Sequence, residues 1–176
     1  MQRSEIKPNE LVLPSISLWG VQWMLLMSGN YEMGLYNGMT VAWGSLGVMW
    51  GRPFAQIVVR PTRYTLEFLK VHDTFTLSAF DESYEAALER MGSVSGRQHD
   101  KLNESGLTAV ASRVADAPSI KEAELTIECR TIYSDRINPD KIRVEDIHSL
   151  YPEKDYHCIF FGEIVAASGI EKYRAQ

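Results

Sequence analysis

The chain has 176 residues, of which 45% are hydrophobic, and its 18 basic and 23 acidic side chains give a formal net charge of −5. This composition is typical of a globular protein and argues against a disordered one, and the acidic balance argues against a nucleic-acid surface, which needs clustered basic residues. A chain of this length can bury its own core, so we predict one domain over residues 1–176, with residues 1–18 as an N-terminal extension.

The charged residues are spread unevenly along the chain. Residues 11–51 contain a single charged side chain, Glu32, together with all four tryptophans and five of the seven methionines. Pro14 and the many glycine and serine residues of this segment argue against a membrane-spanning helix, and the mixed, proline-broken start argues against a signal peptide. We therefore expect a soluble, cytoplasmic protein without membrane contact, in which this segment is buried or binds a ligand or partner.

Two strands come first in the predicted order of elements. Residues 21–27 and 36–43 are apolar runs separated by the turn-forming cluster Ser28-Gly29-Asn30, and together they predict a β-hairpin. Residues 54–59 are a β-branched run opened by Pro53, which suits the start of a strand.

The middle of the chain alternates between short helices and a strand. Leu66 and Leu69 stand at helical spacing and predict a helix over residues 65–71, and clean alternation predicts a strand over residues 75–80. A second helix is expected over residues 84–91, capped by Asp81 or Ser83. Residues 100–104 predict a helical turn that ends at Gly106.

The last third contains two more strands. In residues 124–133 the side chains of Leu125, Ile127 and Cys129 face one way, while Glu124, Thr126, Glu128 and Arg130 face the other. Residues 137–156 are polar and predict an excursion on the surface, and residues 157–166 form a strand interrupted at Gly162. Cys129 and Cys158 lie within strand-like runs, which favours reduced thiols.

The sum is six or seven short strands with two or three short helices, and no glycine-rich dinucleotide fingerprint follows the first strand. This order of elements favours a mainly β, antiparallel barrel over a βαβ fold.

The first of three candidate site patterns is the segment 37–43, which continues into a glycine-rich stretch. As a strand it presents backbone amides beside Asn37 and Thr40, flanked by the apolar surfaces of Met39 and Trp43, a mixture that suits a flat heteroaromatic ligand. The alternative is a hairpin turn at Asn37-Gly38 followed by a core strand.

The second pattern is Arg60-Pro61-Thr62-Arg63-Tyr64-Thr65, at the junction of a strand and a helix. Pro61 ends the strand, and two arginines at the start of a helix oppose the helix dipole, which favours a bound anion such as a phosphate. The alternative is a capped helix with surface arginines.

The third pattern is the loop at residues 95–101, whose small Ser-Gly start, arginine and lysine suit closure over an anionic ligand. The alternative is a solvated loop. Metal chemistry and a nucleophilic serine are not predicted, because no serine has the nucleophile-elbow pattern and the histidines are scattered, at His72, His99, His148 and His157.

Together the three patterns resemble the flavin reductase-like, FMN-binding split-barrel family, and most closely its flavoredoxin-like branch. The likeness rests on residues 37–50, 60–65 and 95–101 and extends over about residues 21–164. Two departures from the family pattern are Ala42, in place of a serine, and His99, in place of a hydrophobic residue.

The resemblance implies a homodimeric, six-stranded split barrel that holds FMN near the subunit interface, with Trp50 and its Met-rich neighbours as candidates for the dimer contact. The strand that would line the isoalloxazine ring comprises Asn37, Met39, Thr40, Val41, Ala42 and Trp43. Arg60, Arg63, Tyr64 and Thr65 would surround the phosphate, and Ser95, Gly96 and Lys101 would close the site.

In function, the resemblance implies an FMN-dependent oxidoreductase that takes electrons from NADH or NADPH and passes them to a second acceptor. The alternatives are a non-enzymatic FMN electron carrier supplied by a protein partner, and a structural barrel that dimerises through its Trp- and Met-rich surface without a cofactor.

Overall fold

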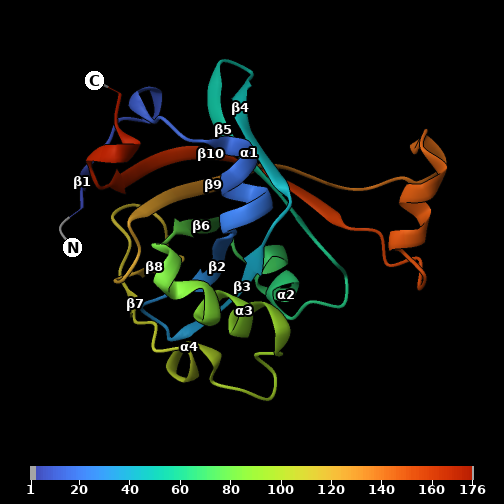
Figure 1. The fold of residues 1–176 in the computed structure, drawn as a ribbon, viewed down its shortest axis with the longest axis horizontal. Helices are drawn as coiled ribbons and strands as arrows, with labels where there is room; N and C mark the ends of the chain where they lie inside the picture. The colour runs from blue at the N-terminus through green and yellow to red at the C-terminus, as the bar shows by residue number, and fades with distance from the viewer. Residues whose placement is uncertain (1–2, 176) are drawn as a thin grey trace.

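A single antiparallel sheet dominates the computed structural model, which describes residues 3–175 (Figure 1). Its strand order is β3-β2-β6-β9-β10-β5-β4, with β1 paired to β10. The strands are β1 (Ser4–Glu5), β2 (Met24–Asn30), β3 (Leu35–Val41), β4 (Gly44–Met49), β5 (Arg52–Val59), β6 (Thr74–Ala79), β9 (Leu125–Arg136) and β10 (Cys158–Gly169). A separate two-stranded ribbon pairs β7 (Ala109–Val110) with β8 (Ser119–Ile120).

The sheet closes on itself because of where β3 and β4 lie. These two strands occupy opposite ends of the strand order, yet only Ala42 and Trp43 separate them in the chain. The sheet must therefore curl until its edges meet at these two residues, although no ladder joins β3 to β4. The predicted mainly β, antiparallel split barrel is confirmed, and all six predicted strands are present, but the predicted count of six is too low because β1 and β4 bring the sheet to eight strands.

Short helices cover the outside of the barrel. The α-helices are α1 (Ser15–Ser17), α2 (Thr65–Val71), α3 (Glu85–Ser93) and α4 (Lys101–Glu104), and a π-helical turn spans Leu18–Gln22. The 3-10 turns are Pro8–Glu10, Glu82–Tyr84, Pro139–Lys141, Glu145–Leu150 and Glu171–Tyr173. The helices predicted at residues 65–71 and 84–91 are confirmed, as is the turn at 100–104, whose cap Asp100 accepts a hydrogen bond from the amide of Asn103.

The burial of β2 explains much of the uncharged segment. Met24 and Leu26 point into the barrel, while Leu25 and Met27 point outward into a second apolar cluster beneath α3, so both faces of the strand are buried. A strand buried on both faces has no position for a charge. Leu18 and Trp19 add to the barrel core from outside the sheet.

The predicted start and end of this first strand are wrong. Residues 18–22 form a helical turn and Trp23 has a φ of 62°, so the strand begins at Met24. The segment 28–30, predicted as a turn, continues β2 and pairs with β3, and the turn lies at residues 31–34. A Cβ on Gly29 would lie 2.2 Å from the carbonyl oxygen of Leu35, so this glycine serves close strand contact and not chain reversal.

Strand β4 was not predicted as an element of its own. It forms a hairpin with β5 through a two-residue turn, Trp50-Gly51, with φ values of 54° and 72°. A turn of this kind needs positive φ at both positions, for which Asn-Gly is the usual sequence signal. Trp-Gly does not carry that signal, so the hairpin could not be identified from the sequence.

The polar face of β9 is largely buried. Glu124, Thr126 and Glu128 are buried and Arg130 is exposed: residues 113–115 of the segment 105–123 bind Glu128, and Lys172 and Tyr173 bind Glu124. The carboxylate of Glu128 accepts the backbone N–H groups of Arg113, Val114 and Ala115 at 3.0, 2.7 and 2.9 Å. These bonds attach the segment 105–123 to the barrel.

Residues 137–157 leave the barrel between β9 and β10 and extend away from it as an arm, on the right of Figure 1. The strand that returns, β10, has a register shift between Phe161 and Gly162, as predicted for an interruption at this glycine. A Cβ there would lie 2.5 Å from Cζ of Phe75, so the bulge accommodates a core phenylalanine. Within residues 3–175, no helix is long and apolar enough to cross a membrane.

Candidate functional site

A cavity of about 180 Å³ lies where the start of α2 meets the segment between α3 and α4, and we call it the α2–α4 cavity. Two stretches of the chain that are distant in sequence, residues 62–65 and 93–101, meet here, and six of the predicted binding residues line the cavity. The lining residues are Thr62, Arg63, Tyr64, Thr65, Ser93, Val94, Ser95, Gly96 and Lys101.

Lys101 is a buried cation at the wall of this cavity. Its Nζ donates to the carbonyl oxygens of Met91 and Val94, at 3.0 and 3.2 Å. Burial, and then the charge of Arg63, lower the pKa of Lys101 to about 8. Since an ammonium group has three donors, one remains for a ligand.

Arg63 is the second cation of the α2–α4 cavity. Its guanidinium donates to the carbonyl oxygen of Gly92, and burial, together with the charge of Arg60, lowers the pKa of Arg63. Across residues 3–175, neither Arg63 nor Lys101 forms a salt bridge. Two adjacent, partly desolvated cations without a carboxylate are unfavourable by themselves and are stabilised by a multivalent anion.

Asn37 joins β3 to this cavity. Its side-chain amide donates to Oγ1 of Thr65 at 2.7 Å and to the carbonyl oxygen of Gly38 at 3.3 Å. A Cβ on Gly96 would lie 2.1 Å from Oδ1 of Asn37, so the loop can close onto β3 only with glycine at this position. Asn37 and Gly38 lie within β3, which excludes the alternative of a turn at these residues.

The other predicted residues of this strand differ in orientation. The side chains of Met39 and Val41 are in the barrel core, and the hydroxyl of Thr40 donates to the carbonyl oxygen of Leu88. Met39 and Val41 therefore have only backbone groups to offer a ligand. On the side away from β2, no strand pairs with β3 in the described structure, because β3 is an edge strand.

Arg60 lies outside the α2–α4 cavity. Its guanidinium binds both carboxylate oxygens of Asp155, at 2.8 and 2.9 Å, and the carbonyl oxygen of Leu150, and it lies 4.9 Å above the ring of Tyr151. The structure therefore uses Arg60 to attach the arm to the barrel, in contrast to its predicted place around the phosphate.

His157 is a neighbour of the predicted site that sequence reasoning missed. Its ring centroid lies 5.1 Å from that of Trp43 at the barrel seam, and its Nδ1 lies 2.9 Å from the hydroxyl of Tyr151. Burial, and then the charge of Arg60, lower the pKa of His157 to about 4. The contact joins residues that are far apart in the sequence, and no motif signals it.

The lowered pKa of His157 has a consequence for stability. In the unfolded chain a histidine takes up a proton near pH 6.5, whereas the folded protein resists protonation of His157 until about pH 4. Stability should therefore fall as the pH decreases from 6.5 to 4, and more steeply in the wild type than in His157→Gln. Urea unfolding of both proteins at several pH values measures this, and parallel curves would contradict it.

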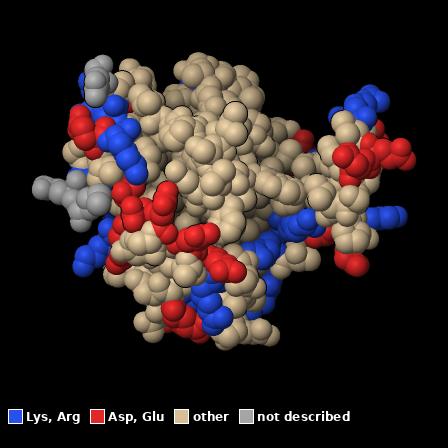
Figure 2. Space-filling view, in the orientation of Figure 1, with Lys and Arg blue, Asp and Glu red and all other residues tan. Residues whose placement is uncertain are grey.

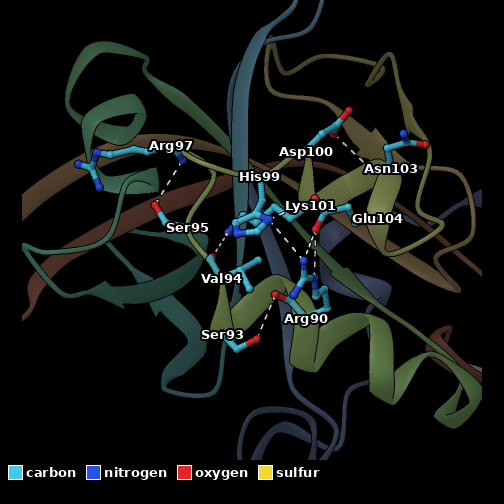
Figure 3. A network of polar contacts seen from close by, with 10 residues as sticks. All are labelled: Arg90, Ser93, Val94, Ser95, Arg97, His99, Asp100, Lys101, Asn103 and Glu104. Carbon is cyan, nitrogen blue, oxygen red and sulfur yellow. Dashed lines mark hydrogen bonds and ion pairs between the residues drawn. The ribbon is translucent and has the colours of Figure 1, made fainter.

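The loop at residues 95–101 is held by a polar network at its C-terminal end (Figure 3). Arg90 donates to the carboxylate of Glu104, and Nδ1 of His99 lies 3.2 Å from the same carboxylate. Arg97 points away from Lys101, pairs with Glu67 and lies over the ring of Tyr64. His99 therefore helps to hold the loop against α4 through Glu104.

No group of three His, Cys, Asp or Glu side chains in residues 3–175 is arranged as metal ligands would be. Cys129 and Cys158 are not linked to each other, and burial raises the pKa of the Cys129 thiol.

Comparison with known proteins places this geometry in context. A family model described as flavin reductase like domain matches residues 27–175. An uncharacterised protein of Pyrococcus abyssi is 28% identical over 152 residues, which cover 85% of this chain and 74% of the relative.

Two solved structures share the fold. Flavoredoxin from Methanosarcina acetivorans has a TM-score of 0.67 and 24% identity, covering 98% of this chain and 78% of its own. An NADH:FAD oxidoreductase of Streptomyces globisporus has a TM-score of 0.64 and 20% identity, covering 87% of this chain and 78% of its own. At these identities the structural likeness shows the fold alone.

Proposed function

Because this chain belongs to the flavin reductase-like domain family, we propose that it binds FMN and acts as a flavin-dependent oxidoreductase. The observation that carries the proposal is the pair of cations in the α2–α4 cavity, Arg63 and Lys101, which have no carboxylate partner among residues 3–175. A ribityl phosphate is a dianion, and it would supply the negatively charged partner that these two cations lack.

The residues of the cavity fit a phosphate group. Lys101 has an unused donor, Arg63 lines the same cavity, and the hydroxyl groups of Thr65 and Ser95 add neutral donors. Gly96 keeps the loop close to β3, which leaves a small cavity in place of an open groove. These residues would bind the phosphate and exclude water from it.

The ring would follow the free edge of β3 towards the barrel seam. Backbone groups of residues 39–42 would meet the polar edge of the ring, and Trp43 with His157 would provide apolar and aromatic contact. His157 would be neutral at pH 7, because its pKa is about 4. When bound, FMN supplies the hydride and electron chemistry, and the protein supplies binding and orientation.

The two candidate activities differ in the source of their electrons. The fold is shared by a flavoredoxin and by an NADH:FAD oxidoreductase, so an oxidoreductase using NADH or NADPH and a carrier supplied by a protein partner both agree with it. We favour the oxidoreductase and a cytoplasmic location.

The protein loaded with FMN should be yellow and should be bleached by NADH or NADPH without oxygen. Slow bleaching by both would favour the carrier, and failure to take up FMN would contradict flavin binding itself.

FMN affinity should depend on pH through Lys101. The phosphate binds best to the protonated ammonium, whose pKa in the free protein is about 8. Affinity should be constant near pH 7 and fall by up to about tenfold per pH unit above pH 8. In Lys101→Arg, which stays charged, the fall should disappear, and an identical pH profile in both proteins would contradict the role of Lys101.

We further propose that the protein is a homodimer formed through its uncharged face. Figure 2 shows a broad area without Lys, Arg, Asp or Glu over α1 and the β4–β5 hairpin. Val48 and Trp50 are 73% and 65% exposed there. The ring centroid of Trp50 lies 6.4 Å from that of Tyr133, so the aromatic surface extends to Tyr133. A second copy fits this face because an uncharged apolar surface and an unpaired edge strand complement themselves.

Val48→Lys should convert the dimer to a monomer, because it places a charge on the edge of β4. Val71→Lys is the matched control, since Val71 is equally exposed, at 76%, but lies at the end of α2. Sedimentation velocity measures both variants beside the wild type. A monomeric wild type, or a dimer that tolerates Val48→Lys, would contradict this interface.

A further inference from the structure

The arm, residues 137–157, is firmly attached at its base. Tyr151 and Tyr156 are buried there, and their rings stack with centroids 4.4 Å apart. Arg60 joins this base to the barrel through its ion pair with Asp155 at 2.8 Å. The arm is therefore a preorganised projection from the barrel, and a partner that binds it has less chain to order than it would with a loose loop.

The far part of the arm carries a row of exposed aliphatic side chains. Val144, Ile147 and Leu150 are 55%, 37% and 47% exposed, and they belong to the 3-10 turn Glu145–Leu150 and its N-cap. The amide of Ile147 donates to the carbonyl oxygen of Val144 at 3.3 Å. Side chains three residues apart align in a 3-10 helix, so these three form one ridge, which we call the arm ridge.

Charged residues surround the arm ridge. Figure 2 shows side chains of both signs around the uncharged surface of the arm. The exposed charged neighbours in the sequence are Arg143, Glu145 and Asp146. An apolar centre with a charged rim is the usual anatomy of a protein–protein interface.

The total surface of the chain agrees with an uncovered interface. The folded chain has an accessible surface of 9616 Å². A compact monomer of the same mass, 20.0 kDa, is expected to have about 8,700 Å². The excess of about 900 Å² is close to the roughly 800 Å² that each partner buries in an interface of standard size.

An apolar groove that suits the arm ridge lies on the barrel beside β4, and we call it the β4 groove. It is a cavity of about 480 Å³ between the segment 8–15 and the β4–β5 hairpin, and none of its lining residues that the structure describes is charged. Val48 lines it, so the groove is continuous with the proposed dimer face. Its apolar walls come from Leu11, Leu13, Leu46, Val48, Phe54 and Ile164.

From this complementarity we infer that the arm ridge of each protomer inserts into the β4 groove of a second copy of this chain. Within one copy the arm points away from the β4–β5 hairpin and the N-terminal segment, so the ridge does not fill its own groove (Figure 1). Two such contacts related by a twofold axis form a closed dimer that covers both ridges and both grooves. Because this contact is part of the proposed homodimer, the inference rests on that dimer.

A charge at the centre of the arm ridge should weaken the dimer. Ile147→Lys introduces this charge, and Ser149→Lys is the matched control, because Ser149 is exposed on the same turn but is not part of the ridge. Sedimentation velocity over a range of concentrations gives the dissociation constant of each dimer. We expect Ile147→Lys to raise this constant at least about tenfold and Ser149→Lys to change it less than about twofold. Circular dichroism equal to that of the wild type shows that each variant is folded.

Cross-linking identifies the two surfaces that meet. Val48→Cys combined with Ile147→Cys places one thiol in the β4 groove and one on the arm ridge. A short bismaleimide should join these thiols between copies, giving more covalent dimer on a denaturing gel than either single variant. Val48→Cys combined with Val71→Cys is the control, because Val71 is exposed at the end of α2 and lies outside both surfaces. It should give no more covalent dimer than Val48→Cys alone.

The arm–groove contact is overturned if Ile147→Lys dimerises as tightly as Ser149→Lys, or if the double cysteine variant gives no excess of covalent dimer. Either result leaves the proposed dimer intact. Association of the wild type beyond a dimer would also overturn the reciprocal contact, because ridges and grooves that do not pair reciprocally build open polymers. A monomeric wild type would instead overturn the proposed dimer, and the inference with it, while FMN uptake tests the flavin site separately.

Discussion

Replacing Lys101 with methionine should weaken FMN binding about 10- to 100-fold. A hydrogen bond to a charged group contributes about 1.5–3 kcal/mol, and Lys101 has one donor directed to no protein acceptor in the described structure. Arg63→Ala should have an effect of similar size, because its guanidinium lines the same cavity. Titration of the apoprotein with FMN, followed by flavin fluorescence, measures both.

A matched control separates this effect from general loss of charge or fold. Lys70→Met removes an exposed lysine from α2 and should leave FMN affinity unchanged. Lys101→Met should not unfold the apoprotein, because it removes a charge that burial disfavours. FMN affinity equal to that of the wild type in both Lys101→Met and Arg63→Ala would contradict the phosphate site.

Replacing Glu128 with alanine should reduce the free energy of unfolding by about 3 kcal/mol or more. The carboxylate accepts three backbone N–H groups from residues 113–115 and is itself almost fully buried. Without it, the amide of Ala115 loses its partner in a buried environment, and the amides of the exposed residues Arg113 and Val114 lose hydrogen bonds to a charged group, each of which contributes about 1.5–3 kcal/mol.

Equilibrium unfolding in urea measures this loss, and Glu89→Ala is the control. Glu89 is an exposed residue of α3, so its replacement should change stability by about 0.5 kcal/mol or less. If Glu128→Ala were no less stable than Glu89→Ala, the segment 105–123 would not depend on this carboxylate for its attachment to β9.

Six of the eight strands of the sheet could be predicted because each of the six carries a local pattern. Alternation in residues 75–80 and a β-branched run in residues 54–59 are visible within single stretches of the sequence. The same holds for α2, whose leucines stand at helical spacing after Thr65. The candidate phosphate site could be predicted for the same reason, since its residues come from two short, charged motifs.

Features that depend on distant contacts could not be predicted. Arg60 resembles a phosphate ligand in its local motif, yet Asp155, from the arm, is near enough to pair with it. His157 seems isolated in the sequence, but barrel closure brings it to Trp43. Glu128 alternates as an exposed residue would, and only the path of residues 105–123 buries it.

The near absence of charged residues from the segment 11–51 has several structural causes. Its strand β2 is buried on both faces, and Leu18 and Trp19 pack into the core. At the end of β4 and in the turn that follows it, Val48 and Trp50 are exposed, which burial in the monomer does not explain. The composition bias predicted a segment that is buried or binds a ligand or partner, and it combines a core strand with the proposed flavin-binding edge and the proposed dimer face.

The most direct test of the flavin site compares the affinities of FMN and riboflavin for the wild-type apoprotein. The two molecules share the ring and the ribityl chain and differ in the phosphate that Arg63 and Lys101 would bind. We expect FMN to bind at least about 100-fold more tightly than riboflavin, and Lys101→Met to reduce that ratio about tenfold or more. Equal affinities for FMN and riboflavin would contradict the assignment of the α2–α4 cavity to the phosphate.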